Sequence, residues 1–170
     1  MNTAEKTREP LGLAPHATAE LRSMDRLVAL FQRRQLPWQL WSHRTHLVVG
    51  LHYLLRYGFE EGIQRLRVRI RQYNEEIGIR NDDRGGYHET ATVSMMWGLA
   101  QFRRRNARVR NRYVLMRRLW SDPVSDPGFL SRSYSEARLR STLARRQWVE
   151  PDLVRLPLDA RRRIYDVTER

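Results

Sequence analysis

Apolar residues recur every three or four positions along most of the chain, the spacing that places them on one face of an α-helix. Such stripes predict six helices, at 18–34, 41–57, 59–77, 87–105, 108–120 and 133–148. The clearest stripe has the spacings 3, 4, 3 and 4 and consists of Ile63, Leu66, Ile70, Tyr73 and Ile77. It is followed at once by Gly78, a residue typical of helix C-termini.

No segment shows the alternation expected of a strand, so the pattern predicts an all-α fold. A chain of 170 residues fits one hydrophobic core, and we expect a single-domain bundle of about five to six helices over residues 17–157. Residues 1–16 are polar with two prolines and are predicted to be a disordered lead. Residues 158–170 are predicted to be a C-terminal tail.

Histidines stand where apolar residues are expected at the start of two stripes. His43 and His46 begin the stripe of the second predicted helix, and His88 begins that of the fourth. Short links favour antiparallel neighbours, so the second and fourth helices are expected to run parallel, with their N-termini at the same end. His43, His46, His88 and Glu89 would then meet beside the loop at 78–86.

Three interpretations of this cluster remain open. His43, His46, His88 and Glu89 could hold a divalent transition metal, Zn or Fe, because these ions accept imidazole and carboxylate ligands. Alternatively, His88 and Glu89 could act as catalytic acid–base residues without a metal. Under either hypothesis Asn81 and Tyr87 would line the rim and contact a small anionic substrate. In the third, the histidines are structural and the chain is a non-catalytic interaction protein.

Positive charge suggests an alternative partner. The chain has 32 basic and 19 acidic residues, a net charge of +13, and every basic residue except Lys6 is arginine. Residues 102–118 contain eight arginines and no acidic residue, so this segment could neutralise nucleic-acid phosphates, with Tyr113 and Trp120 stacking on bases. Both aromatic residues also fit the buried stripe of the fifth predicted helix.

Several classes of function are excluded or disfavoured. The chain has no cysteine, which rules out disulfides, thiolate zinc sites and cysteine nucleophiles. It has no Walker-type or dinucleotide glycine motif and no G-x-S-x-G elbow. No apolar run approaches the roughly 20 residues that span a bilayer, and the polar N-terminus lacks a signal-peptide core. A cytoplasmic protein without membrane partners is therefore expected.

Three blocks of the sequence together resemble a family of small bacterial helical proteins of uncharacterised function. The blocks are SHRTHLVVGLHYLL, NDDRGGYHET and YSEARLRSTLARRQWVEPDLVRLP, within residues 38–157. The family shares an H-x-x-H-L block, a G-Y-H-E-T block and a closing Y-S…A-R…P-D-L segment. The resemblance falls on His43, His46, Leu47, Tyr87, His88, Glu89 and Thr90. It implies no reaction, substrate or cofactor. A looser likeness to three-histidine metal-binding bundles of the DinB type concerns arrangement only.

Overall fold

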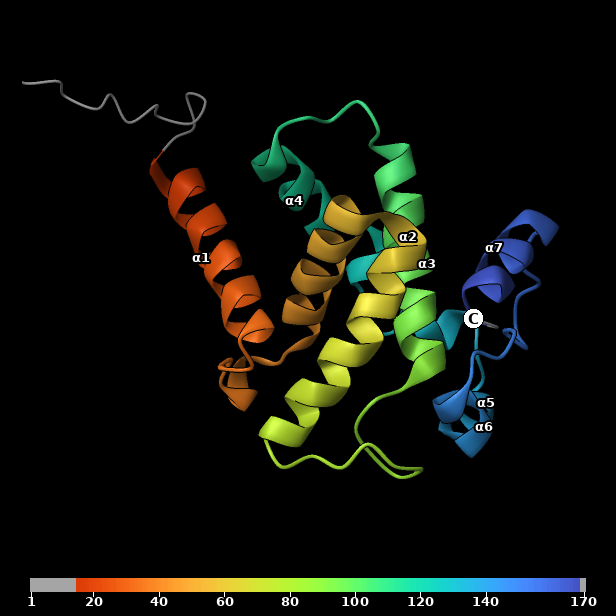
Figure 1. The fold of residues 1–170 in the computed structure, drawn as a ribbon. Helices are drawn as coiled ribbons and strands as arrows, with labels where there is room; N and C mark the ends of the chain where they lie inside the picture. Colours follow the sequence, from red (N-terminus) through yellow and green to blue (C-terminus); the bar gives the residue numbers. More distant parts are fainter. Residues whose placement is uncertain (1–14, 169–170) are drawn as a thin grey trace, which may run out of the picture.

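All regular secondary structure is helical in residues 15–168, the part of the chain that the computed structural model describes (Figure 1). The helices are α1 Pro15–Gln32, η1 Trp38–Leu40, α2 His43–Glu76, α3 Glu89–Arg105, α4 Arg112–Trp120, η2 Pro123–Ser125, η3 Leu130–Arg132, α5 Glu136–Arg140, α6 Thr142–Arg146 and α7 Leu158–Thr168, where η marks a single-turn 3-10 helix. The all-α prediction is confirmed. Of the predicted lead at 1–16, residues 1–14 lie outside the described residues, while Pro15 and His16 begin α1.

Helix α2 comprises two arms joined at Gly58, and these arms correspond to the two helices predicted at 41–57 and 59–77. Gly58 has φ 78° and ψ −171°, a conformation that favours glycine and interrupts the helix. In Figure 1 the first arm runs upward, the second arm returns downward, and α3 runs upward again. The first arm of α2 and α3 therefore run in the same direction, as the short links predicted.

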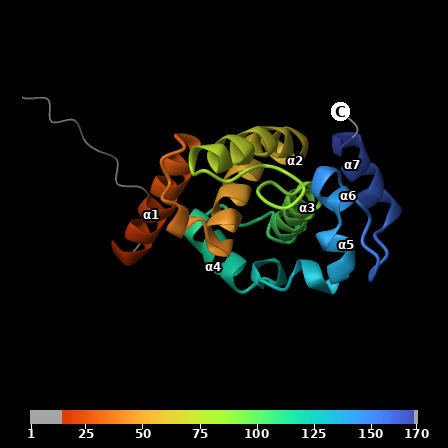
Figure 2. The same cartoon turned by 90° about the horizontal axis from the view of Figure 1, so that it is seen from below.

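The main core lies between the two arms of α2 and α3. Leu47, Ile63 and Leu99 are fully buried there. Gly50 allows α3 to approach closely, because a Cβ at this position would lie 2.7 Å from Cδ1 of Leu99. Viewed from below, α1 covers one side of this core, and α5, α6 and α7 lie on the opposite side, beyond α3 (Figure 2). Among residues 15–168 no helix is long and apolar enough to cross a membrane.

The helix predicted at 133–148 is divided into α5 and α6. Ser141 has extended backbone angles and caps α6, since its hydroxyl accepts a hydrogen bond from the amide of Ala144. Tyr134 and Trp148 are buried, but Leu143, which one continuous helix over 133–148 would place in the core with them, is 52% exposed. The break changes which positions face inward, so a stripe drawn through one continuous helix fails here.

The predicted tail at 158–170 contains helix α7. Its inward face is the short stripe Ala160, Ile164 and Val167, all of them buried. The end of α7 contacts α2 through a hydrogen bond of 3.2 Å from Nε2 of Gln64 to the carbonyl oxygen of Val167. This helix therefore packs against the bundle rather than extending from it.

The loop between α2 and α3 depends on Gly86, whose φ is 73°. An added Cβ would lie 2.4 Å from the carbonyl oxygen of Arg80 and 2.8 Å from Oδ1 of Asn81. At the neighbouring Gly85 a Cβ would fit without a clash, because the nearest atom would be 3.8 Å away. A Cβ can therefore be accommodated at Gly85 but not at Gly86.

We predict that Gly86→Ala lowers the free energy of unfolding by at least about 2 kcal/mol, because it combines left-handed strain with a backbone clash. Gly85→Ala, the matched control, should change it by less than about 0.5 kcal/mol. Urea unfolding of both variants tests this expectation. Equal effects would show that the loop does not impose the described conformation on Gly86.

Candidate functional site

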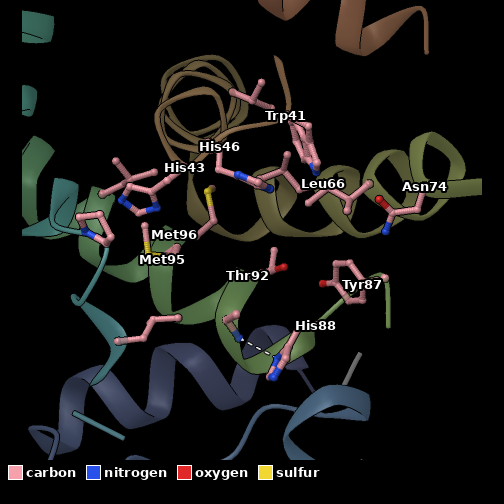
Figure 3. Close-up of a pocket in the computed structure, with 18 residues that line it drawn as sticks. Trp41, His43, His46, Leu66, Asn74, Tyr87, His88, Thr92, Met95 and Met96 are labelled. Atoms are coloured by element: carbon pink, nitrogen blue, oxygen red, sulfur yellow. Dashed lines mark hydrogen bonds between the residues drawn. The ribbon is translucent and has the colours of Figure 1, made fainter. Parts of the chain in front are cut away.

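A cavity of about 280 Å³ lies between the two arms of α2, the start of α3 and the turn that contains Pro127 and Leu130 (Figure 3). Most of its wall is apolar, formed among others by Val49, Leu66, Ile70, Met95, Met96 and Leu99. His43, His46, Tyr87 and His88 also line it. Three histidines from two helices are thus among the residues that line the cavity, but they do not form a cluster.

The four predicted metal ligands do not form a metal centre. Within residues 15–168 no group of three or more His, Cys, Asp or Glu side chains is arranged to hold a metal ion. In Figure 3, His43 and His46 lie on the α2 side of the cavity, whereas His88 lies on the far side at the start of α3. The partners of each side chain explain why they do not converge.

His88 is the N-cap of α3. Its Nδ1 accepts a hydrogen bond of 3.2 Å from the amide of Ala91, so the proton of the neutral ring must be on Nε2. Nε2 then donates to the carbonyl oxygen of Leu139 at 2.9 Å. Desolvation lowers the pKa of His88 below 6.5 and favours this neutral form. With both nitrogens engaged, His88 is a structural residue here, and its contacts do not support the predicted metal-binding or catalytic role.

Glu89 forms an ion pair inside the protein and does not line the cavity. Its side chain is buried, and Nε of Arg67 donates to its two carboxylate oxygens at 3.0 and 3.1 Å. Nη2 of Arg67 and the hydroxyl of Tyr87 donate to the same carboxylate. Four hydrogen bonds therefore occupy the oxygens that the metal and catalytic hypotheses required. Helical periodicity did not identify Arg67 as a partner of Glu89, because Arg67 follows the buried Leu66 and is not a member of the apolar stripe.

Asn81 stabilises the loop before α3. Its Oδ1 accepts hydrogen bonds from Nδ2 of Asn74 at 2.9 Å and from the amide of Tyr87 at 3.0 Å. Its Nδ2 donates to the carbonyl oxygen of Arg71 and to Glu75. Because all four hydrogen-bonding positions are used, Asn81 is not available to contact a substrate in the predicted way. A substrate contact through this amide is therefore not supported.

Tyr87 lines the cavity, as predicted, and is itself buried. Burial and the nearby carboxylate of Glu89 raise the pKa of its phenol, so the hydroxyl stays protonated and donates to Glu89 at 2.9 Å. The guanidinium of Arg71 lies 4.4 Å from the centre of its ring. Tyr87 thus connects the cavity wall to the buried ion pair.

Among the three histidines that line the cavity, His46 is the one with an open acceptor. Its Nδ1 donates to the carbonyl oxygen of Ser42 at 2.7 Å, which leaves the lone pair on Nε2 without a hydrogen-bond partner among the described residues. His46 is exposed, the centre of its ring lies 4.0 Å from that of Trp41, and desolvation by the surrounding protein lowers its pKa below 6.5. His43 instead donates from Nε2 to the carbonyl oxygen of Ser125 at 3.1 Å, which ties the turn to α2.

No protein-family model matches the chain, and searches of curated proteins and of solved structures found no match. The family resemblance inferred from the three sequence blocks therefore stays a prediction.

We predict that Glu89→Gln lowers the free energy of unfolding by about 3–5 kcal/mol, because it leaves the charge of Arg67 without its counterion in a largely buried place. The matched control is Glu61→Gln, which removes the same kind of charge from the exposed pair with Arg65. Urea unfolding should show little change for the control. A similar small effect for both variants would contradict a structural role for the buried pair.

We also predict that acid destabilises the protein partly through His88. Its pKa is lower in the folded state, so between that value and about 6.5 the unfolded chain binds more protons, and the free energy of unfolding falls as pH falls through this window. His88→Asn keeps a cap acceptor but does not titrate. Unfolding measured at about pH 7.5 and about pH 5.5 should show a smaller loss in the variant. An unchanged loss would assign the acid sensitivity to other groups.

Proposed function

We propose that the protein binds a small, mainly apolar organic molecule in the cavity between α2 and α3, with His46 as the polar anchor. The observation that supports this most is the unused Nε2 of His46, an acceptor placed on a largely apolar wall. Binding sites for small molecules commonly combine apolar walls with a few directed polar groups. The cavity is close to the lower end of the size range of such sites.

The chemistry of the wall favours a neutral ligand with a hydrogen-bond donor. Among residues 15–168 no arginine lines the cavity, so an anionic group would enter without a fixed countercharge from this part of the chain. The neutral imidazole of His46 accepts a hydrogen bond from a hydroxyl or an amide N–H and does not attract a carboxylate. Thr92 and Tyr87 lie across the cavity from His46 in Figure 3 and add hydroxyl groups. The proposal therefore keeps the predicted small molecule but replaces the expected anion with a neutral donor.

Cavity filling provides the first test. Ala91 lines the cavity, and Ala91→Leu adds three carbons to its space, whereas Ala137→Leu adds the same atoms to an exposed position of α5. We expect toluene at millimolar concentration to raise the melting temperature of the wild type and of Ala137→Leu, but not of Ala91→Leu. Equal stabilisation of all three proteins, or of none, would refute the proposed site.

The role of His46 is tested by comparing phenol with toluene. The two molecules have similar shapes, but phenol carries a hydroxyl group where toluene carries a methyl group. Replacing His46 with Leu should reduce the affinity for phenol relative to toluene by about threefold to tenfold, the effect of one lost hydrogen bond. Titrations followed by ligand-induced chemical shifts give the two ratios. An unchanged ratio in the variant would show that Nε2 of His46 does not receive the ligand's hydroxyl.

A further inference from the structure

A cluster of arginines occupies the end of the molecule where α3 finishes and α4 begins, at the top of Figure 1. Between Glu89 and Asp122 the chain has eight arginines and no acidic residue. Four of the eight are engaged within the described structure. Arg103 and Arg118 bind Asn106, Arg105 pairs with Asp122, and Arg112 pairs with Asp25.

The other four, Arg104, Arg108, Arg110 and Arg117, are exposed, and their side chains form no hydrogen bond or ion pair with any residue in 15–168. Arg104 and Arg117 lie in the last turns of α3 and α4, where the helix dipole favours a cation. Arg108 and Arg110 lie in the loop between these helices, where no helix dipole accounts for an exposed cation. Their mutual repulsion is relieved when an anionic partner approaches.

The same end has a shallow groove with an aromatic wall. Tyr113, which is half-buried, lines it together with Asn106, Arg117 and Arg118. An aromatic ring beside guanidinium groups suits a nucleotide, because the ring offers a stacking surface for a base and arginine pairs with phosphate. In a duplex the base faces are already stacked on one another, so this combination favours a single strand.

We propose that this end of the protein binds single-stranded nucleic acid, with Arg108, Arg110 and Arg117 contacting phosphates and Tyr113 stacking on a base. This surface is separate from the cavity: none of the four residues lines it. A test that refutes one of the two proposals therefore leaves the other unaffected.

Charge-matched variants test the phosphate contacts. The first carries Arg108→Gln, Arg110→Gln and Arg117→Gln. The control carries Arg155→Gln, Arg162→Gln and Arg163→Gln, which removes the same charge from exposed positions in and just before α7, away from α4 in Figure 1. Fluorescence polarisation with a labelled single strand of about ten nucleotides measures affinity over a range of salt concentrations.

We expect the first variant to bind at least about tenfold more weakly than the wild type at about 0.1 M salt, and its log–log salt slope to be smaller by about 2. The control should change by less than about threefold. Equal losses in both variants would show that only net charge matters and would overturn the proposal. So would the absence of wild-type binding at this salt concentration.

Two further variants test the stacking. Tyr113→Phe keeps the ring and should bind like the wild type, whereas Tyr113→Leu should lose about fivefold or more. A duplex of the same length should bind more weakly than the single strand. If the leucine variant binds as well as the phenylalanine variant, or the duplex binds as well as the single strand, a stacked base at Tyr113 is ruled out.

Discussion

The ion pair between Arg67 and Glu89 is the constraint on which the rest of the arrangement depends. A buried carboxylate is tolerated only where hydrogen bonds and an opposite charge replace water, and Glu89 receives four such bonds at the N-terminal end of α3. Arg67 comes from the second arm of α2 and also donates to the carbonyl oxygen of Val167 in α7. One guanidinium therefore fixes the start of α3, the end of α7 and, through Tyr87, one wall of the cavity.

Helical periodicity predicted the central elements because burying an apolar face requires the 3.6-residue repeat. The two arms of α2 and α3 were found, together with their relative directions, since short links leave few alternatives. Shorter elements were missed for a physical reason. The stripe of α7 has three members, separated by exposed arginines such as Arg162, and the cap at Ser141 divides one predicted helix into two. Hydrogen bonds between a side chain and the nearby backbone determine where such breaks occur. The spacing of apolar residues does not reveal these hydrogen bonds.

The candidate site was predictable in its location but not in its chemistry. A stripe shows which face a residue occupies, and His43, His46 and His88 all line the cavity. It does not show which partner each ring nitrogen finds. His88 binds Leu139, which is 51 residues away in sequence, and Glu89 binds Arg67 from another helix. These non-local partners turn two predicted ligands into structural residues and leave His46 as the imidazole with an unused acceptor.

Charge is distributed so that the interior and the surface favour different ligands. The net charge of +13 is carried largely by exposed arginines, while the cavity contains none. The positive charges also act on the histidines: the pKa of His52 is lowered by desolvation and then by Arg112 and Arg56. Arginines thus contribute to keeping His52 neutral, whereas desolvation is the main cause of the lowered pKa of His46. A neutral His46 accepts a hydrogen bond from a donor, and the exposed arginines attract phosphate from outside. The net charge therefore acts at the outer surface, and the ligand of the cavity is selected by the side chains that line it.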